Sequence, residues 1–153
     1  MLRGAYVDPA RGKMTLVEYV EKRWKPAQHH LVSGTLETYD RHWRNRIRPR
    51  LGDRQLGSLT RGDTKNFVAE IKGTVGTSTL HTTFATLRIF MQAAVDDELI
   101  VANPCTRVKL PPIEDRELTM FSAEQVWALA DAISPRYRLA MIPAVGAGLR
   151  QCP

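Results

Sequence analysis

The sequence has few of the residues that build disulfide frameworks and metal centres. Its two cysteines, Cys105 and Cys152, stand in unrelated contexts, and its four histidines are scattered without the spacing of metal ligands. We therefore expect no disulfide, no metal and no cofactor. Sparse, unpaired cysteines are also typical of a reducing compartment, so we expect a cytoplasmic protein.

Long apolar runs and strand-like segments are absent as well. No run reaches the roughly 18–20 apolar residues that span a bilayer, so no membrane contact is expected. Residues 1–13 contain no apolar stretch of signal-peptide length. No convincing strand sequence exceeds about five residues. The chain of 153 residues is therefore predicted to be all-α, with one domain or one domain and a piece of another.

Positive charge is concentrated in one short segment. Residues 41–54 contain six arginines and one aspartate, so this segment holds five of the six net positive charges of the chain. A concentrated basic patch is the electrostatic footprint of a polyanionic partner, of which nucleic acid is the commonest. The alternative is an arginine-rich surface that is only solvated.

The first predicted helix covers Thr15 to Lys25. Thr15 can cap it, with Glu18 three residues on, which is the pattern of a capping box. Pro26 is expected to stop this helix because proline lacks the backbone N–H group.

The second predicted helix runs from Gly34 to about Arg48, with Ser33 as its cap and with Pro49 and Gly52 at its end. At 100° per residue its apolar residues fall within about 80° of one another. These are Leu36, Tyr39, Trp43 and Ile47. Three arginines of the helix fall within about 60° on a different side. They are Arg41, Arg44 and Arg48.

Two further helices are predicted in the first two thirds of the chain, after a short extended segment at residues 55–59. One begins at Thr60, with Asp63 at its third position, and ends near Ile71. The other is the longest, running from Ser78 to about Glu98. Its expected buried stripe consists of Leu80, Phe84, Leu87, Met91 and Val95. A polar face beside this stripe holds His81, Arg88 and Gln92, which either contact a partner or simply face water.

Helical periodicity stops between residues 109 and 117. The adjacent prolines 111 and 112 and the charged residues around them are typical of an interdomain linker. Ser122 then caps a helix that runs to Ile133, with Gln125 at its third position. Ser134 and Pro135 start another helix.

The ordered set of short motifs along the chain resembles the tyrosine recombinases, specifically phage-type integrases. No single motif is specific, but the order extends over nearly the whole chain. The matching positions are Trp24, Ser33-Gly34-Thr35-Leu36, Tyr39, Ile47-Arg48-Pro49-Arg50-Leu51-Gly52, Leu56-Gly57, Leu59-Thr60, Ser78-Thr79-Leu80, Phe90, Ala93, Val95, Leu99-Ile100, Asn103-Pro104-Cys105, Leu118-Thr119, Glu124-Gln125, Arg136-Tyr137-Arg138 and Gly148-Leu149-Arg150.

The resemblance implies a division of the chain at the linker. Residues 1–12 would be a flexible N-terminus, and residues 13–108 a core-binding (SAM-like) DNA-binding domain of four to five helices. Residues 109–117 would be the linker. Residues 118–153 would hold the first helices of an incomplete catalytic domain. The partner expected from the family is double-stranded DNA that carries an attachment-type site.

The resemblance also assigns roles to single residues. Arg150 matches the first catalytic arginine of the family, which grips the scissile phosphate. The family's other catalytic residues, including the tyrosine nucleophile, follow that arginine, so Arg150 would be a remnant and this chain no enzyme by itself. The expected DNA-binding residues are Arg41, Arg44, Arg48, Thr79, His81 and Arg88.

Several functions fit this pattern. The leading hypothesis is a DNA-binding fragment of an integrase, truncated just after the first catalytic arginine and inactive alone. A second is a stand-alone DNA-binding regulator or decoy that occupies recombination sites. A third is a remnant without function, and a fourth is a split site completed by an intact recombinase or by a downstream-encoded fragment.

Overall fold

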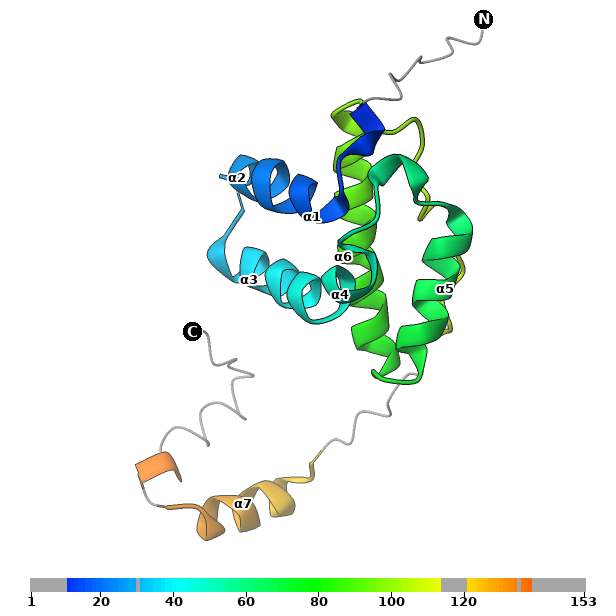
Figure 1. The fold of residues 1–153 in the computed structure, drawn as a ribbon. Helices are drawn as coiled ribbons and strands as arrows, with labels where there is room; N and C mark the ends of the chain where they lie inside the picture. Colours follow the sequence, from blue (N-terminus) through cyan, green and yellow to red (C-terminus); the bar gives the residue numbers. More distant parts are fainter. Residues whose placement is uncertain (1–10, 30, 114–120, 135, 139–153) are drawn as a thin grey trace, which may run out of the picture. The chain divides into compact units, whose positions relative to one another are not determined.

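The computed structural model describes residues 11–29, 31–113, 121–134 and 136–138. The chain divides into two compact units, residues 1–114 and residues 115–153. Within the described residues every regular element is helical, and the only β pairing is an isolated antiparallel bridge between Thr15 and Gln55 (Figure 1). The all-α prediction is confirmed. None of the described helices is long and apolar enough to cross a bilayer.

The first helical run follows a short 3₁₀ turn, η1 (Arg11–Lys13). It consists of α1 (Leu16–Tyr19), the π-helical η2 (Val20–Trp24) and α2 (Lys25–Ala27). Its predicted capping box is confirmed. The Glu18 N–H donates to the Thr15 Oγ1 at 3.3 Å, and the Thr15 N–H donates to the Glu18 carboxylate at 3.1 Å.

The second helical run consists of α3 (Ser33–His42), the π-helical η3 (Trp43–Ile47) and α4 (Arg48–Leu51). Ser33 was expected to cap this run, but it is the first helical residue instead. Val32 takes the N-cap position and provides no side-chain cap. The run also continues three residues beyond its predicted end at Arg48.

Both runs pass through a proline that was expected to end them. The cause is a π turn immediately before each proline. The Lys25 N–H donates to the Val20 carbonyl, and the Arg48 N–H donates to the Trp43 carbonyl, five residues back in each case. In a regular α-helix the ring of Pro26 or Pro49 would clash with the carbonyl four residues earlier. The wider π turn changes that hydrogen-bonding register, so the helix continues through the proline.

The segment after α4 is compact rather than extended. It forms a 3₁₀ turn, η4 (Leu56–Ser58), and its backbone bonds to the start of the first run. The Leu16 N–H donates to the Arg54 carbonyl and the Leu56 N–H to the Met14 carbonyl, both at 2.9 Å. These bonds satisfy the backbone without a sheet, which explains why the predicted extended segment is not a strand.

The next two helices confirm the expected caps and buried faces in most respects. Helix α5 (Arg61–Lys72) has the Thr60–Asp63 capping box and buries Phe67, Val68 and Ile71. Helix α6 (Thr77–Asp96) starts one residue before the predicted position, with Gly76 as its N-cap. All of its predicted apolar stripe is buried except Val95, which is half-buried against the core.

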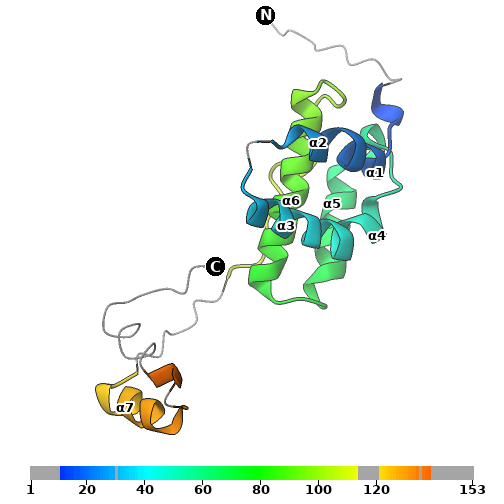
Figure 2. The same ribbon diagram turned by 90° about the vertical axis from the view of Figure 1, so that its left-hand side faces the viewer.

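Helix α6 is the central element of the first unit. It packs against α3 and η3 on one side and against α5 on another (Figures 1 and 2). Its Phe90 ring lies edge-on to Trp24 and Trp43, with ring centroids 4.6 and 5.6 Å apart. All three side chains are buried. This aromatic cluster joins the first two helical runs to α6 and fixes the position of the basic segment that they carry.

The described part of the second unit centres on α7 (Ala123–Ala132). Its predicted capping box is confirmed, because the Gln125 N–H donates to the Ser122 Oγ at 3.3 Å and the Ser122 N–H donates to the Gln125 side chain at 2.9 Å. Among the α7 residues only Ala130 is buried. Most of the helix predicted from Ser134 and Pro135 lies outside the described residues.

Candidate nucleic-acid interface

Five of the six arginines of residues 41–54 fall into two groups that the sequence does not separate, and the sixth, Arg46, is half-buried. Arg44, Arg50 and Arg54 form ion pairs with Asp40 at 2.6 Å, with Glu70 at 3.4 Å and with Asp63 at 3.2 Å. Arg41 and Arg48 are exposed, and no described carboxylate lies within ion-pair distance of either. The positive charge that remains for a partner is therefore concentrated at Arg41 and Arg48.

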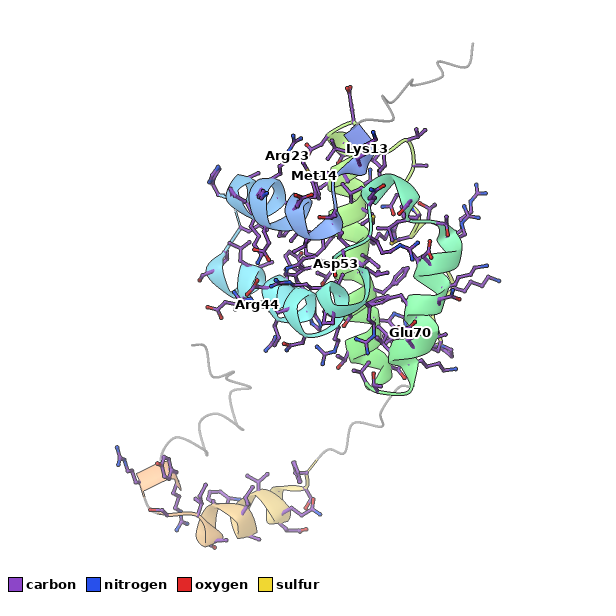
Figure 3. All side chains as sticks on the ribbon, viewed as in Figure 1. Lys13, Met14, Arg23, Arg44, Asp53 and Glu70 are labelled. Carbon is purple, nitrogen blue, oxygen red and sulfur yellow. The ribbon has the colours of Figure 1, made fainter. Side chains whose placement is uncertain are left out.

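Arg44 shares its ion-pair partner with a second cation. Its partner Asp40 also accepts from the Lys25 Nζ at 2.6 Å, and Lys25 in turn bonds to Glu21 at 2.9 Å. The Arg44 side chain remains 66% exposed at the surface of the second run (Figure 3). Because an exposed ion pair contributes only about 0.2–1 kcal/mol, a phosphate can compete for this guanidinium.

The predicted angle of about 60° between the three arginines depends on a regular helix. That estimate assumes α-helical winding from Arg41 to Arg48. The observed run contains the π-helical turn Trp43–Ile47, whose hydrogen bonds span five residues. The spacing of 100° per residue therefore does not hold between Arg44 and Arg48. All three side chains are exposed nonetheless.

His42 is a buried polar residue that was not among the residues predicted from the sequence. Its Nδ1 lies 2.9 Å from the Thr83 Oγ1, and the Thr83 hydroxyl donates its one hydrogen to the Thr79 carbonyl at 2.8 Å. The hydroxyl can therefore only accept from His42, which assigns the proton to the His42 Nδ1. Burial, together with the nearby Arg46 and Arg41, lowers the pKa of His42. This bond ties α3 to the first turns of α6.

The first turn of α6 holds the predicted residue Thr79, which is half-buried. Gly76 at the N-cap has no side chain to accept from the amides of this turn. Backbone N–H groups at such a helix start are suited to an anion. Thr79 also takes part in the His42 network through its carbonyl, so this turn is held against α3.

His81 and Arg88 have different surroundings, although both lie on α6. The His81 Nε2 donates to the Pro111 carbonyl at 2.7 Å, so this nitrogen holds the end of the first unit. The backbone carbonyl of Arg88 accepts from the Asn103 side chain at 3.1 Å. The Arg88 side chain itself is exposed and has no ion pair with any described carboxylate. Of the two side chains, only that of Arg88 is exposed.

Comparison with known proteins identifies relatives of the chain. Integrases of the mycobacterium phages FRAT1 and D29 are each 30% identical over 141 residues, which is 92% of this chain. This chain is an integrase homologue. The resemblance to the phage-type tyrosine recombinases is confirmed. The aligned residues cover 41% and 37% of the two relatives, so the homologue spans about two fifths of their length. No protein-family model matches the chain.

Solved structures agree with the fold of the integrase homologue. The integrase-like domain from Bacillus cereus has a TM-score of 0.62 and 26% identity, and it covers 71% of this chain and 93% of that domain. The Tn1549 transposon integrase in complex with circular intermediate DNA has a TM-score of 0.74 and 19% identity, over 90% of this chain and 47% of that protein. The expected SAM-like helical domain is thereby confirmed.

The catalytic residue expected in the integrase homologue, Arg150, lies outside the described residues. Two described tyrosines take part in packing and hydrogen bonding within the fold. The Tyr19 hydroxyl donates to the Asp97 carboxylate at 2.8 Å, and burial raises the pKa of Tyr19. Tyr39 packs edge-on against Trp24 at 5.9 Å. Among the described residues no group of three or more histidines, cysteines or carboxylates could hold a metal ion.

Proposed function

We propose that the first unit of this integrase homologue binds double-stranded DNA. Its predicted boundaries are residues 13–108, and the target is an attachment-type site of a mobile element. The observation that carries the proposal is the distribution of charge. Arg41 and Arg48 are exposed without a described carboxylate partner, whereas Arg50 and Arg54 are paired with acids of α5. Unpaired guanidinium groups on a rigid helix are suited to phosphates and to guanine edges.

Helix α6 adds a second set of contacts in this proposal. Arg88 provides an exposed cation, and the first turn around Thr79 offers backbone N–H groups to a phosphate. His81 is proposed to act mainly by position, because its Nε2 is occupied by the Pro111 carbonyl. The His42–Thr83 bond holds α3 against α6, so both sets of contacts are fixed before DNA arrives.

The relatives support the proposal at two levels. The phage relatives are integrases, and the Tn1549 integrase, which shares this fold, was captured with DNA of a circular transposon intermediate.

For three to five phosphate contacts, the logarithm of the binding constant should fall with the logarithm of salt concentration with a slope of about −3 to −4.5.

The test of DNA binding is a triple substitution, Arg41→Ala, Arg44→Ala and Arg48→Ala, measured by fluorescence anisotropy with labelled duplexes. We expect affinity at moderate salt to fall by about tenfold or more and the salt slope to decrease by about 3. The melting temperature should change little, because the one ion pair that it removes among the described residues is Arg44–Asp40, and Asp40 keeps Lys25 as a partner.

The matched control removes the same charge from three exposed cations elsewhere, with Lys22→Ala, Arg23→Ala and Arg61→Ala. This control should retain most of the affinity. If both triple variants lose affinity equally, binding reflects net charge alone, and the surface formed by Arg41, Arg44 and Arg48 (the arginine surface) is not the site. If neither loses affinity, the proposal that this unit binds DNA through α3, η3 and α4 is wrong.

We further propose that the 153-residue polypeptide by itself cleaves no DNA strand. The support is the placement of two described tyrosines, since Tyr19 is buried in the core and Tyr39 packs against it. The test is incubation with a nicked suicide duplex followed by denaturing electrophoresis. A covalent protein–DNA band would refute the proposal.

A further inference from the structure

A second cluster of positive charge lies on the first unit, away from residues 41–54. A groove of about 570 Å³ separates α5 from residues 107–111. Four cationic side chains line it, and all four are exposed. They are Lys65, Lys72, Arg107 and Lys109. No carboxylate lines the groove, and no described carboxylate forms an ion pair with any of these cations.

The groove is separate from the surface that holds residues 41–54, because α5 carries its acidic and its basic side chains on opposite flanks. Asp63 and Glu70 are seven residues apart, on the flank that pairs with Arg54 and Arg50. Lys65 and Lys72 are also seven residues apart, and each lies two positions after one of these acids. At 100° per residue the two pairs point about 160° apart around the helix. The acids thus neutralise arginines on one side, and the lysines face the groove on the other.

The groove has an apolar floor beneath its cationic rim. The floor residues belong to α5 and to the segment opposite. They are Val68, Ala69, Val108, Leu110 and Pro111. Val68 is part of the core, and Val108 and Leu110 pack against it. Interfaces that hold a DNA backbone are strongly polar and basic throughout. An apolar floor between cations instead matches a peptide that carries both acidic and apolar side chains.

The wall of the groove is held in place at both ends. The Asn103 side chain donates to the Arg88 carbonyl at 3.1 Å and accepts from the Cys105 N–H at 2.9 Å, and His81 holds the Pro111 carbonyl at 2.7 Å. Between these anchors Arg107 has φ of 62°, a left-handed conformation that is costly for a residue other than glycine. The fold therefore keeps a strained arginine at the rim of the groove.

We propose that this groove is a docking site for an acidic, partly apolar peptide segment of a protein partner. Its carboxylates would pair with Lys65, Lys72, Arg107 and Lys109, and its apolar side chains would cover Val68 and Leu110. The proposal does not depend on DNA binding by the arginine surface. It adds a protein-contact surface on the opposite flank of α5, so one unit can contact DNA and a second protein at the same time.

The experiment uses the full chain and a fluorescein-labelled nonapeptide in which glutamate and leucine alternate. Two comparison probes have glutamine in place of glutamate, or glutamate at every position. We expect the alternating peptide to bind at least tenfold more tightly than either comparison probe, because only it supplies both kinds of contact. Equal binding of the all-glutamate peptide would overturn the proposal, since the apolar floor would then contribute nothing.

Two substitutions test the groove itself. Ala69→Glu places a carboxylate among the four cations, and we expect roughly tenfold weaker peptide binding, because several ion pairs are weakened together. Its matched control is Asn66→Glu, which makes the same change of charge at an exposed position of α5 outside the groove. Arg107→Gly should weaken peptide binding several-fold while the melting temperature stays the same or rises, because glycine accepts this φ without strain.

The same variants separate this proposal from DNA binding. The triple-alanine variant of Arg41, Arg44 and Arg48 should bind the peptide normally, whereas Ala69→Glu should bind DNA within twofold of the Asn66→Glu control. If Ala69→Glu weakens DNA binding tenfold and the peptide does not bind, the groove is a second DNA surface and the peptide proposal is overturned.

Discussion

The bond between His42 and Thr83 offers a sharp test of how this unit is held together. Thr83→Val keeps the shape of the side chain and removes its hydroxyl. The His42 Nδ1–H, which is buried with a side chain only 6% exposed, would then lose its acceptor. Leaving a buried donor without a partner costs about 1–3 kcal/mol of folding free energy. For a unit of about a hundred residues this corresponds to a melting temperature lower by roughly 5–15 °C.

The chain contains a matched control for this substitution on the same helix. Thr86 is equally buried and donates to the Thr82 carbonyl at 2.9 Å, as Thr83 donates to the Thr79 carbonyl, but no histidine donates to it. Thr86→Val should therefore change stability by much less than Thr83→Val. Because the carbonyl four residues back already accepts a backbone bond, its loss of one hydroxyl donor has little effect.

Chemical denaturation followed by tryptophan fluorescence measures both variants, and DNA anisotropy provides a second assay. Thr83→Val should also lower DNA affinity, since its bond positions α3 against α6, while Thr86→Val should not. Equal destabilisation by the two substitutions would refute the assignment of His42 as a donor to Thr83. An intact DNA affinity for a destabilised Thr83→Val would refute the claim that this bond positions the DNA surface.

Buried groups give three further predictions. Burial lowers the pKa of His42 below its ordinary value of 6.5, so the unfolded chain binds the proton more readily than the folded chain. The free energy of unfolding should therefore fall as the pH drops from about 7 through the lowered pKa of the folded state. Thermal melts should show this loss of stability, and His42→Gln should make the loss smaller. Burial raises the pKa of the Cys105 thiol to about 12, so little reactive thiolate forms in the native chain. In a Cys152→Ser background, iodoacetamide at pH 8 should label the native chain at least a hundredfold more slowly than the unfolded chain. Rapid labelling of the native chain would contradict the burial of Cys105. Phe90→Ala should cost about 3–5 kcal/mol in urea denaturation, because Phe90 is fully buried against Trp24 and Trp43; a loss below 1 kcal/mol would show that the aromatic cluster is not central.

Local signals in the sequence predict the helices well. The capping boxes at Thr15, Thr60 and Ser122 each depend on two residues three positions apart, so the pattern can be read without knowing the fold. The buried apolar stripe of α6 follows from the helical repeat of its own residues. The prolines mislead because the π turns before them have no local sequence signal. Trp24 and Trp43, which lie in these turns, pack against Phe90, more than forty residues further along the chain.

The candidate site is less predictable for the same reason. The run of arginines is visible in the sequence, but its neutralisation depends on Asp63 and Glu70 of another helix. The groove on the other flank of α5 combines residues 65 and 72 with residues 107 and 109, whose charges are too dispersed to form a run. His42 carries a weak signal, since it follows Tyr39 at helical spacing, but its partner Thr83 is set by the fold.

The π turn at Trp43–Ile47 lets the second helical run hold one residue more than regular α-helical winding would. Each residue added to a regular α-helix rotates everything beyond it by about 100°. A π turn instead takes up the added residue within one wider turn, so the helix beyond it keeps nearly the same direction. A homologue that lacks one residue here should therefore show regular α-helical bonding and still present its residues beyond the turn to the same side of its target.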